Sequence, residues 1–213
     1  CEISVDKMGN VFARREGVDS SLPAVGTGSH LDTQPTGGKY DGVFGVLAGV
    51  EVLRTLHENQ IETPTPMEFS VWTNEEGSRF QPAMQGSGTY VGRFDLETEL
   101  NKTDVNGIRL GDELERIGYL GDAELGSRHI GAFFETHIEQ GPILEDEKKM
   151  IGVVRLGQGI RWYNIEVEGR PSHSGTTPMH LRKDAMLAAS LIVAEMENIA
   201  NRHENGLGTV GFM

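Results

Sequence analysis

Three apolar stretches of the chain each run into histidine or carboxylate residues beside glycine, and this pattern constrains the fold more than any other. The first stretch ends at His30 and Asp32, the second at Glu75 and Glu76, and the third at His137. Open α/β sheets bind their ligands at the carboxyl ends of the strands. The pattern therefore predicts one polar cleft at one edge of a sheet.

The loop after the first stretch adds a further carboxylate. His30 and Asp32 are two residues apart, so on a strand they share one face. A carboxylate beside an imidazole suits a metal-binding histidine, because it fixes the tautomer and orientation of the ring. Asp41 follows after a glycine-rich loop. By itself this stretch is equally compatible with a structural histidine at a strand end, with Asp32 as a capping residue.

The second and third stretches favour a metal site. Glu75 and Glu76 are neighbours at a strand end, so their side chains point to different sides and one can bind a metal while the other faces water. Two histidines, one aspartate and a glutamate pair suit zinc, which takes nitrogen and carboxylate ligands. Convergence of these residues predicts a metal centre.

Periodicity predicts the surrounding elements. Apolar residues at helical spacing indicate helices at about 43–59 and 182–202, and an alternating pattern at 163–168 indicates a strand wet on one face. Strands are also expected at 151–156 and 208–213. Gly157-Gln158-Gly159 is the best hinge candidate, and it predicts a domain boundary with residues 1–158 on one side and 159–213 on the other.

Composition limits the functional classes. The 213 residues include 37% hydrophobic and 24% charged residues, an ordinary globular composition. A net charge of −13 argues against nucleic acid as a partner. The only cysteine, Cys1, excludes an intrachain disulfide, and no apolar run approaches the roughly 20 residues of a membrane helix. We expect a cytoplasmic protein without a membrane partner.

The motifs together resemble the metal-dependent amidohydrolases of the hydantoinase/carbamoylase group within the M20 peptidase family. The resemblance covers nearly the whole chain, with its closest likeness to the β-alanine synthase (β-ureidopropionase) branch. The residues that carry it are Gly28–Asp32, Lys39–Gly42, Asn74–Gly77, His137–Pro142 and Pro171–Pro178, with Arg182 and Asp184.

The resemblance implies two divalent metal ions. Asp41 would bridge them, His30 and His137 would complete one site, and Glu76 would bind the other. Zinc is the expected metal, with Mn²⁺, Co²⁺ or Ni²⁺ as alternatives. The family takes one more histidine from a later Gly-His-Asp stretch, which these residues do not contain.

The resemblance also implies roles around the metals. Glu75 would be the general base that takes a proton from a metal-activated water, and Asp32 would orient His30. Gln140 would contact the substrate. His173 would stabilise the oxyanion, often across a dimer interface, so a homodimer through the smaller domain is expected. The alternatives are a solvated Glu75 and a loop histidine held by its neighbouring serines.

The implied fold is α/β: a mixed-sheet, zinc-exopeptidase-like catalytic domain followed by the start of an inserted smaller α+β lid or dimerisation domain. The implied reaction hydrolyses β-ureidopropionate or another N-carbamoyl amino acid to the amino acid, carbon dioxide and ammonia. Allantoate, ureidoglycolate or a peptide are alternative substrates, and a metal-binding fragment without activity is the non-enzyme alternative. Since the sequence starts at Cys1 and ends inside the strand expected at 208–213, we expect an internal fragment. Because the later histidine ligand is missing from these residues, we expect the fragment to be inactive alone.

Overall fold

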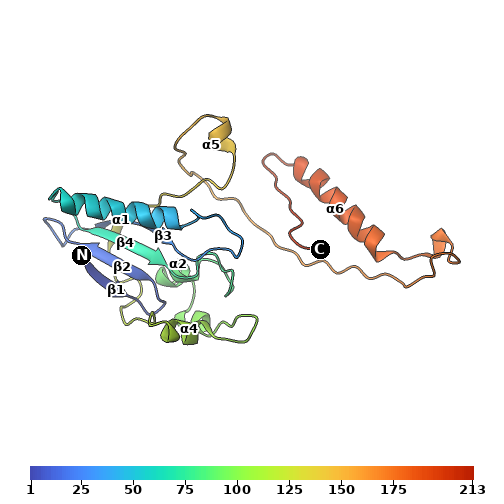
Figure 1. Ribbon diagram of the computed structural model, residues 1–213, viewed down its shortest axis with the longest axis horizontal. Helices are drawn as coiled ribbons and strands as arrows, with labels where there is room; N and C mark the ends of the chain where they lie inside the picture. Colours follow the sequence, from blue (N-terminus) through green and yellow to red (C-terminus); the bar gives the residue numbers. More distant parts are fainter. The chain divides into compact units, whose positions relative to one another are not determined.

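The computed structural model describes all 213 residues and divides them into two compact units, Cys1–Gly152 and Val153–Met213 (Figure 1). The predicted boundary, between residues 158 and 159, lies a few residues inside the second unit. The assignment of a catalytic role to one unit and a lid role to the other stays a prediction. No helix is long and apolar enough to cross a membrane.

A five-stranded mixed sheet forms the centre of the first unit, which confirms the predicted fold class. Its strands occur in the order β1-β2-β4-β3-β5. The strand β3 is parallel to both of its neighbours, β4 and β5, whereas β2 is antiparallel to β1 and β4. The strands are β1 (Glu2–Val5), β2 (Val11–Arg15), β3 (Ala24–His30), β4 (Met67–Trp72) and β5 (Ile130–Phe134).

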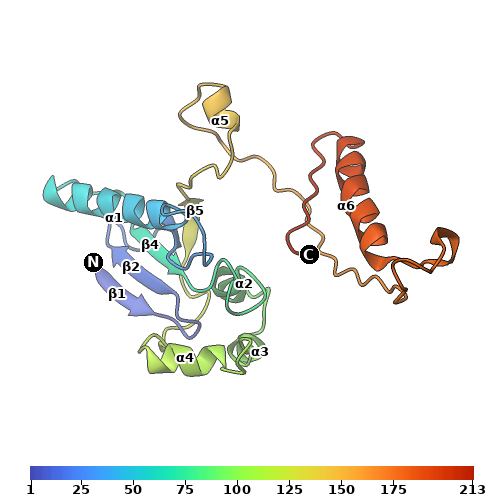
Figure 2. The same ribbon diagram turned by 45° about the vertical axis from the view of Figure 1, so that its right-hand side comes forward.

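The helix α1 (Val43–Glu58) lies along one face of this sheet, as Figures 1 and 2 show. Glycine permits the close approach, because a Cβ at Gly49 would lie 2.7 Å from the Phe69 ring on β4. The buried side chains of Val46, Leu53 and Phe69 form the core between helix and sheet. This core fixes the start of α1 beside the end of β3.

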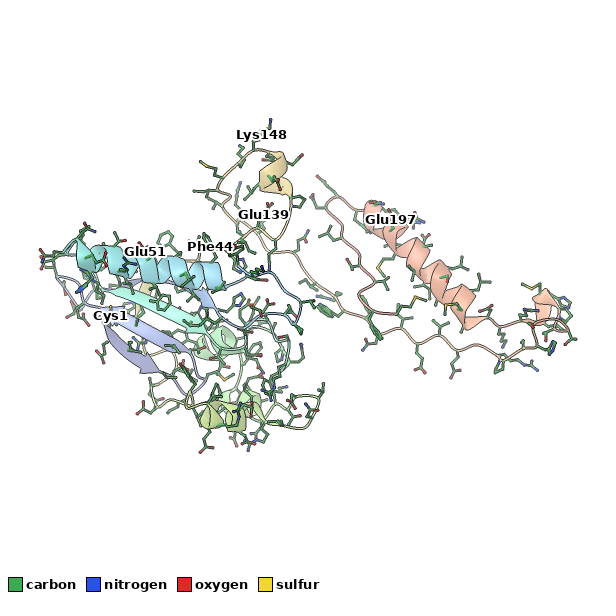
Figure 3. The ribbon with its side chains drawn as sticks, in the orientation of Figure 1. Cys1, Phe44, Glu51, Glu139, Lys148 and Glu197 are labelled. Atoms are coloured by element: carbon green, nitrogen blue, oxygen red, sulfur yellow. The ribbon has the colours of Figure 1, made fainter.

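Four short helices follow in the first unit. They are α2 (Gln85–Tyr90), α3 (Leu96–Leu100), α4 (Leu110–Arg116) and α5 (Ile143–Asp146). A second buried cluster contains Met8, Phe80, Leu110 and Leu114, and it joins the β1–β2 turn to α4. Glu139, labelled in Figure 3, accepts hydrogen bonds from the backbone N–H groups of Ile143 and Leu144 at the start of α5.

The second unit contains the predicted long helix but none of the predicted strands. Its helix α6 (Ala185–Asn201) follows a single turn, η1 (Met179–Leu181), and begins at Asp184, whose carboxylate accepts from the Leu187 N–H. Residues 151–156, 163–168 and 208–213 pair with no other strand. Val154 and Leu156 are each 90% exposed, so these apolar side chains pack against no other part of the chain. Those three strand predictions are wrong for this structure.

Candidate metal centre

Three of the predicted metal ligands meet at one edge of the sheet. His30 is the last residue of β3, Asp41 precedes α1, and His137 follows β5. One potential ligand atom from each lies within 4.8 Å of the other two. The strand β5 ends at Phe134, so His137 belongs to the loop after the strand and not to the predicted strand end.

The separations between these atoms fit one metal ion. The Asp41 Oδ1 atom lies 3.8 Å from His30 Nε2 and 3.4 Å from His137 Nε2. Ligand atoms in a tetrahedral zinc site, about 2.0–2.1 Å from the ion, are roughly 3.4 Å apart. The two imidazole rings also stack, with their centroids 5.7 Å apart.

The hydrogen bonds of both rings leave their Nε2 atoms as acceptors. His30 Nδ1 lies 2.8 Å from the Asp32 carbonyl oxygen, and His137 Nδ1 lies 2.9 Å from the Ile138 carbonyl oxygen. A carbonyl oxygen only accepts, so each neutral ring carries its proton on Nδ1. Two lone pairs then face the carboxylate of Asp41, an arrangement that a shared cation satisfies. The chemistry of the three residues therefore fits a metal.

Asp32 joins the end of β3 to the glutamate pair. Its Oδ1 accepts from the Glu75 backbone N–H at 3.1 Å, and its Oδ2 accepts from the Glu76 N–H at 2.9 Å. The predicted contact with His30 is made mainly by the Asp32 carbonyl oxygen, since the carboxylate is 3.8 Å from His30 Nδ1. Asp32 therefore positions both the histidine ring and the backbone of the two glutamates.

Glu75 lies beside the three-residue group. Its Oε2 atom is 3.5 Å from His30 Nε2, and its side chain is 29% exposed. Burial raises the pKa of Glu75; the nearby His30 lowers it, and the carboxylates of Glu76 and Asp32 raise it further. A partly buried carboxyl group with a raised pKa beside other titratable groups is typical of a proton-transfer site.

Glu76 stands outside the three-residue group. Its Oε2 accepts a hydrogen bond from Gln34 Nε2 at 2.9 Å, and its Oε1 is buried without a hydrogen-bond partner. A buried carboxylate oxygen without a donor has lost its hydration, and a bound cation would compensate for that loss. This observation suits the predicted ligand role, which stays a prediction.

Gln140 contacts a predicted ligand. Its Nε2 donates to Asp41 Oδ2 at 2.6 Å, and its backbone has a φ of 58°. The amide therefore occupies the Asp41 oxygen that does not face the histidines. The substrate contact expected from the sequence stays a prediction.

Three residues that shape this edge had no predicted role in the site: Gly42 and Ser29, which lie within motifs named above, and Glu135. Gly42 has a φ of 65°, and a Cβ there would overlap the His30 ring. The buried Ser29 donates its hydroxyl to Glu135 Oε1 at 2.6 Å, which links β3 to the segment that carries His137. The glycine-rich loop motif included Gly42 without indicating its contact with the His30 ring. Ser29 and Glu135 gave no signal of their own.

His173 lies in the second unit, in the loop before η1, and is exposed. Its Nδ1 accepts hydrogen bonds from the backbone N–H groups of Gly175 and Thr176.

Comparisons with known proteins agree on a family. The model of peptidase family M20/M25/M40 matches residues 26–212. An N-carbamoyl-L-amino-acid amidohydrolase of Rhizobium meliloti is 50% identical over 99% of this chain and 51% of its own length. An allantoate amidohydrolase of Bacillus subtilis (strain 168) is 38% identical over 92% of this chain and 48% of its own length.

A solved structure supports the same family. The amidase of the hydantoinase/carbamoylase family from Burkholderia multivorans superposes with a TM-score of 0.80 and is 48% identical, covering 96% of this chain and 50% of its own. The chain thus spans about half the length of the relatives it matches.

Proposed function

Because the chain belongs to peptidase family M20/M25/M40, we propose that this protein is a metal-dependent amidohydrolase of N-carbamoyl amino acids. One water is added across the carbamoyl C–N bond, and the products are the amino acid, carbon dioxide and ammonia. The similarity to an N-carbamoyl-L-amino-acid amidohydrolase over almost the entire chain supports this substrate class. N-carbamoyl-L-α-amino acids and β-ureidopropionate are both within the proposal.

One observation carries the proposal: the lone pairs of His30 and His137 converge with the Asp41 carboxylate. A divalent ion held by these residues, with a second at Asp41 and Glu76, would polarise the substrate carbonyl and lower the pKa of a water molecule. We propose zinc as that metal.

Glu75 supplies the proton transfer in this proposal. Its carboxylate lies beside His30 yet is partly exposed, so it can reach a water molecule next to the metal centre. It takes a proton from the attacking water and delivers it to the leaving nitrogen. Asp32 holds the backbone of Glu75 while this happens. His173, as the resemblance implies, donates a hydrogen bond to the carbonyl oxygen. The predicted homodimer also stays a proposal.

A substrate panel tests the reaction. We expect the complete protein, loaded with zinc, to release ammonia from N-carbamoyl-L-amino acids with a higher kcat/KM than from allantoate, ureidoglycolate or dipeptides. The relative named for allantoate makes that substrate the second candidate. A preference for allantoate would replace the proposed substrate, and turnover of none of them would favour a metal-binding protein without catalysis.

A double substitution tests the metal centre. His30→Ala with His137→Ala removes two of the three converging groups, so we expect stoichiometric zinc to be lost from the purified protein. Metal analysis by mass spectrometry provides the measurement. His57→Ala with His203→Ala is the matched control, because these two exposed histidines lie outside the group. Retention of zinc by the double variant at His30 and His137 would contradict the assignment.

Two further variants separate the glutamates. Glu75→Gln keeps the size of the side chain but cannot carry a proton, so kcat should fall by about 10²–10⁴ while zinc content is kept. Glu76→Gln should weaken metal binding first, because Glu76 carries the buried carboxylate oxygen without a partner. If Glu75→Gln loses metal and Glu76→Gln only slows turnover, the two roles are exchanged.

A further inference from the structure

The loop around His173 determines which ring nitrogen can donate a hydrogen bond. His173 Nδ1 lies 3.1 Å from the backbone nitrogen of Gly175 and 3.2 Å from that of Thr176. Backbone N–H groups only donate, so Nδ1 is the acceptor in both contacts. In a neutral imidazole the other nitrogen then carries the proton. The tautomer follows from the two partners, and it places the N–H group at Nε2.

The second ring nitrogen is free within this unit. The structure gives His173 Nε2 no hydrogen-bond partner and gives the ring no ion pair, and the side chain is exposed. No carboxylate is therefore available to draw the proton toward Nδ1. The ring presents a single N–H donor to the outside of its own loop.

Arg182 holds this loop in shape. Its Nε donates to the Thr177 carbonyl oxygen at 3.0 Å, and its Nη2 donates to the Ser174 carbonyl oxygen at 2.7 Å. In the sequence, Ser174 and Thr177 flank Gly175 and Thr176, whose N–H groups donate to His173. Arg182 therefore holds the loop on both sides of these two donors. A guanidinium group is a rigid planar fork, which can bind two carbonyls at a fixed separation.

We infer that His173 is presented as a fixed Nε2–H donor and that Arg182 is its positioning residue. The inference rests on the proposed function for the use of the donor. A preorganised N–H stabilises the oxygen of the carbamoyl carbonyl as negative charge develops on it. Two backbone N–H groups occupy the Nδ1 lone pair, and Nε2 carries a proton. The ring can therefore donate a hydrogen bond from Nε2, and it has no free nitrogen lone pair to take a proton from water.

Nuclear magnetic resonance of the whole protein with isotopically labelled histidine nitrogen tests the tautomer without substrate. The spectrum is recorded well above the ordinary histidine pKa of about 6.5, so that neutral rings are compared. His173→Asn identifies the signals. We expect an unprotonated Nδ1 and a protonated Nε2. A protonated Nδ1 in the wild-type protein would overturn the inference.

Arg182→Gln should release the loop and mix the two tautomers of His173. Lys183→Gln is the matched control, because it removes the same charge from the neighbouring position and no side-chain contact of Lys183 supports the loop. Its spectrum should equal that of the wild type. Arg182→Lys, which keeps the charge without the fork, serves if the glutamine variant does not fold. An unchanged His173 signal in the Arg182 variants would remove the positioning role.

A double-mutant cycle tests whether Arg182 acts through His173. His173→Ala should lower kcat by about 10²–10³, the usual loss for one oxyanion donor. Arg182→Gln should lower kcat about tenfold or more in the wild-type background and cause no further loss in the His173→Ala background. Equal losses in both backgrounds would overturn the positioning role. If the spectrum showed a protonated Nε2 but the protein turned over no carbamoyl substrate, the proposed function would be refuted and the tautomer of His173 would stand.

Discussion

Gly42 leaves the space that the His30 ring occupies. Its φ of 65° lies in a region that residues with a side chain rarely adopt, and a Cβ would also overlap the ring of His30. Gly42→Ala should therefore displace the imidazole and weaken zinc binding by about 10–100-fold, as loss of a ligand's support usually does. Competition with a chromogenic chelator measures this affinity.

Gly38→Ala provides the control for this change. Gly38 lies in the same loop, and a Cβ there meets no atom within 4 Å. Its zinc affinity should stay within about twofold of the wild type, since the new methyl group enters open space. If Gly42→Ala also bound zinc with wild-type affinity, the position of the His30 ring would not depend on Gly42.

Residue types at the site could be predicted from the sequence, whereas their contacts could not. His30, Asp41 and His137 stand beside glycine at the ends of apolar runs, and they do converge. The Gln140 contact with Asp41 depends on a backbone with a φ of 58°, which no periodicity encodes. The carboxylate of Asp32 likewise accepts from backbone N–H groups 43 and 44 residues away, which no local sequence pattern encodes.

At the scale of elements, an ion pair links α4 to the loop after β4. Glu113 on α4 pairs with Arg79 at 2.7 Å and with Arg116 at 2.8 Å. The hydrogen bonds from Arg116 and Arg79 lower the pKa of Glu113 from 4.5 to about 2. A carboxyl group with a lowered pKa in the folded state stabilises that state above its unfolded pKa, and this contribution is lost as the pH falls through the folded pKa.

Glu113→Gln should therefore lower the urea midpoint near neutral pH, and its difference from the wild type should shrink as the pH falls from 4.5 toward about 2. Urea unfolding at a series of pH values provides the measurement. Glu115→Gln, a change on the same helix at a carboxylate outside both ion pairs, should leave the midpoint unchanged. A difference independent of pH would rule out the ionised pair as its cause.

The elements that the sequence predicted correctly share a physical basis. The helix α1 and the strands β2 and β4 each place apolar side chains in the buried core, Val46 and Leu53 from α1, Phe12 from β2 and Phe69 from β4, so periodicity reports real burial there. Residues 151–156 and 208–213 show strand-like apolar runs, but strand formation also requires a hydrogen-bonded neighbour. An apolar run in the sequence indicates a preference for forming a strand, but it does not indicate which strand it would pair with.

For the whole molecule, bound metal should contribute to the stability of the fold. A ligand that binds only the folded state stabilises it by about 2.7 kcal/mol when its concentration is 100 times the Kd. Removal of metal by a chelator should therefore lower the melting temperature, and added zinc should restore it. The variant with His30→Ala and His137→Ala should respond to neither treatment. An identical response in that variant would place the stabilising ion elsewhere.

The position of β3 between β4 and β5 has a consequence for how the protein reaches its native state. Asp41 and the Gln140 that contacts it are 99 residues apart in sequence, and closing so long a loop carries an entropic cost. The three converging groups can come together only after β5 has paired with β3, one of the most non-local pairings in the sheet. We therefore expect capture of the proposed metal ion to be a late event in folding, and its rate should report completion of the sheet.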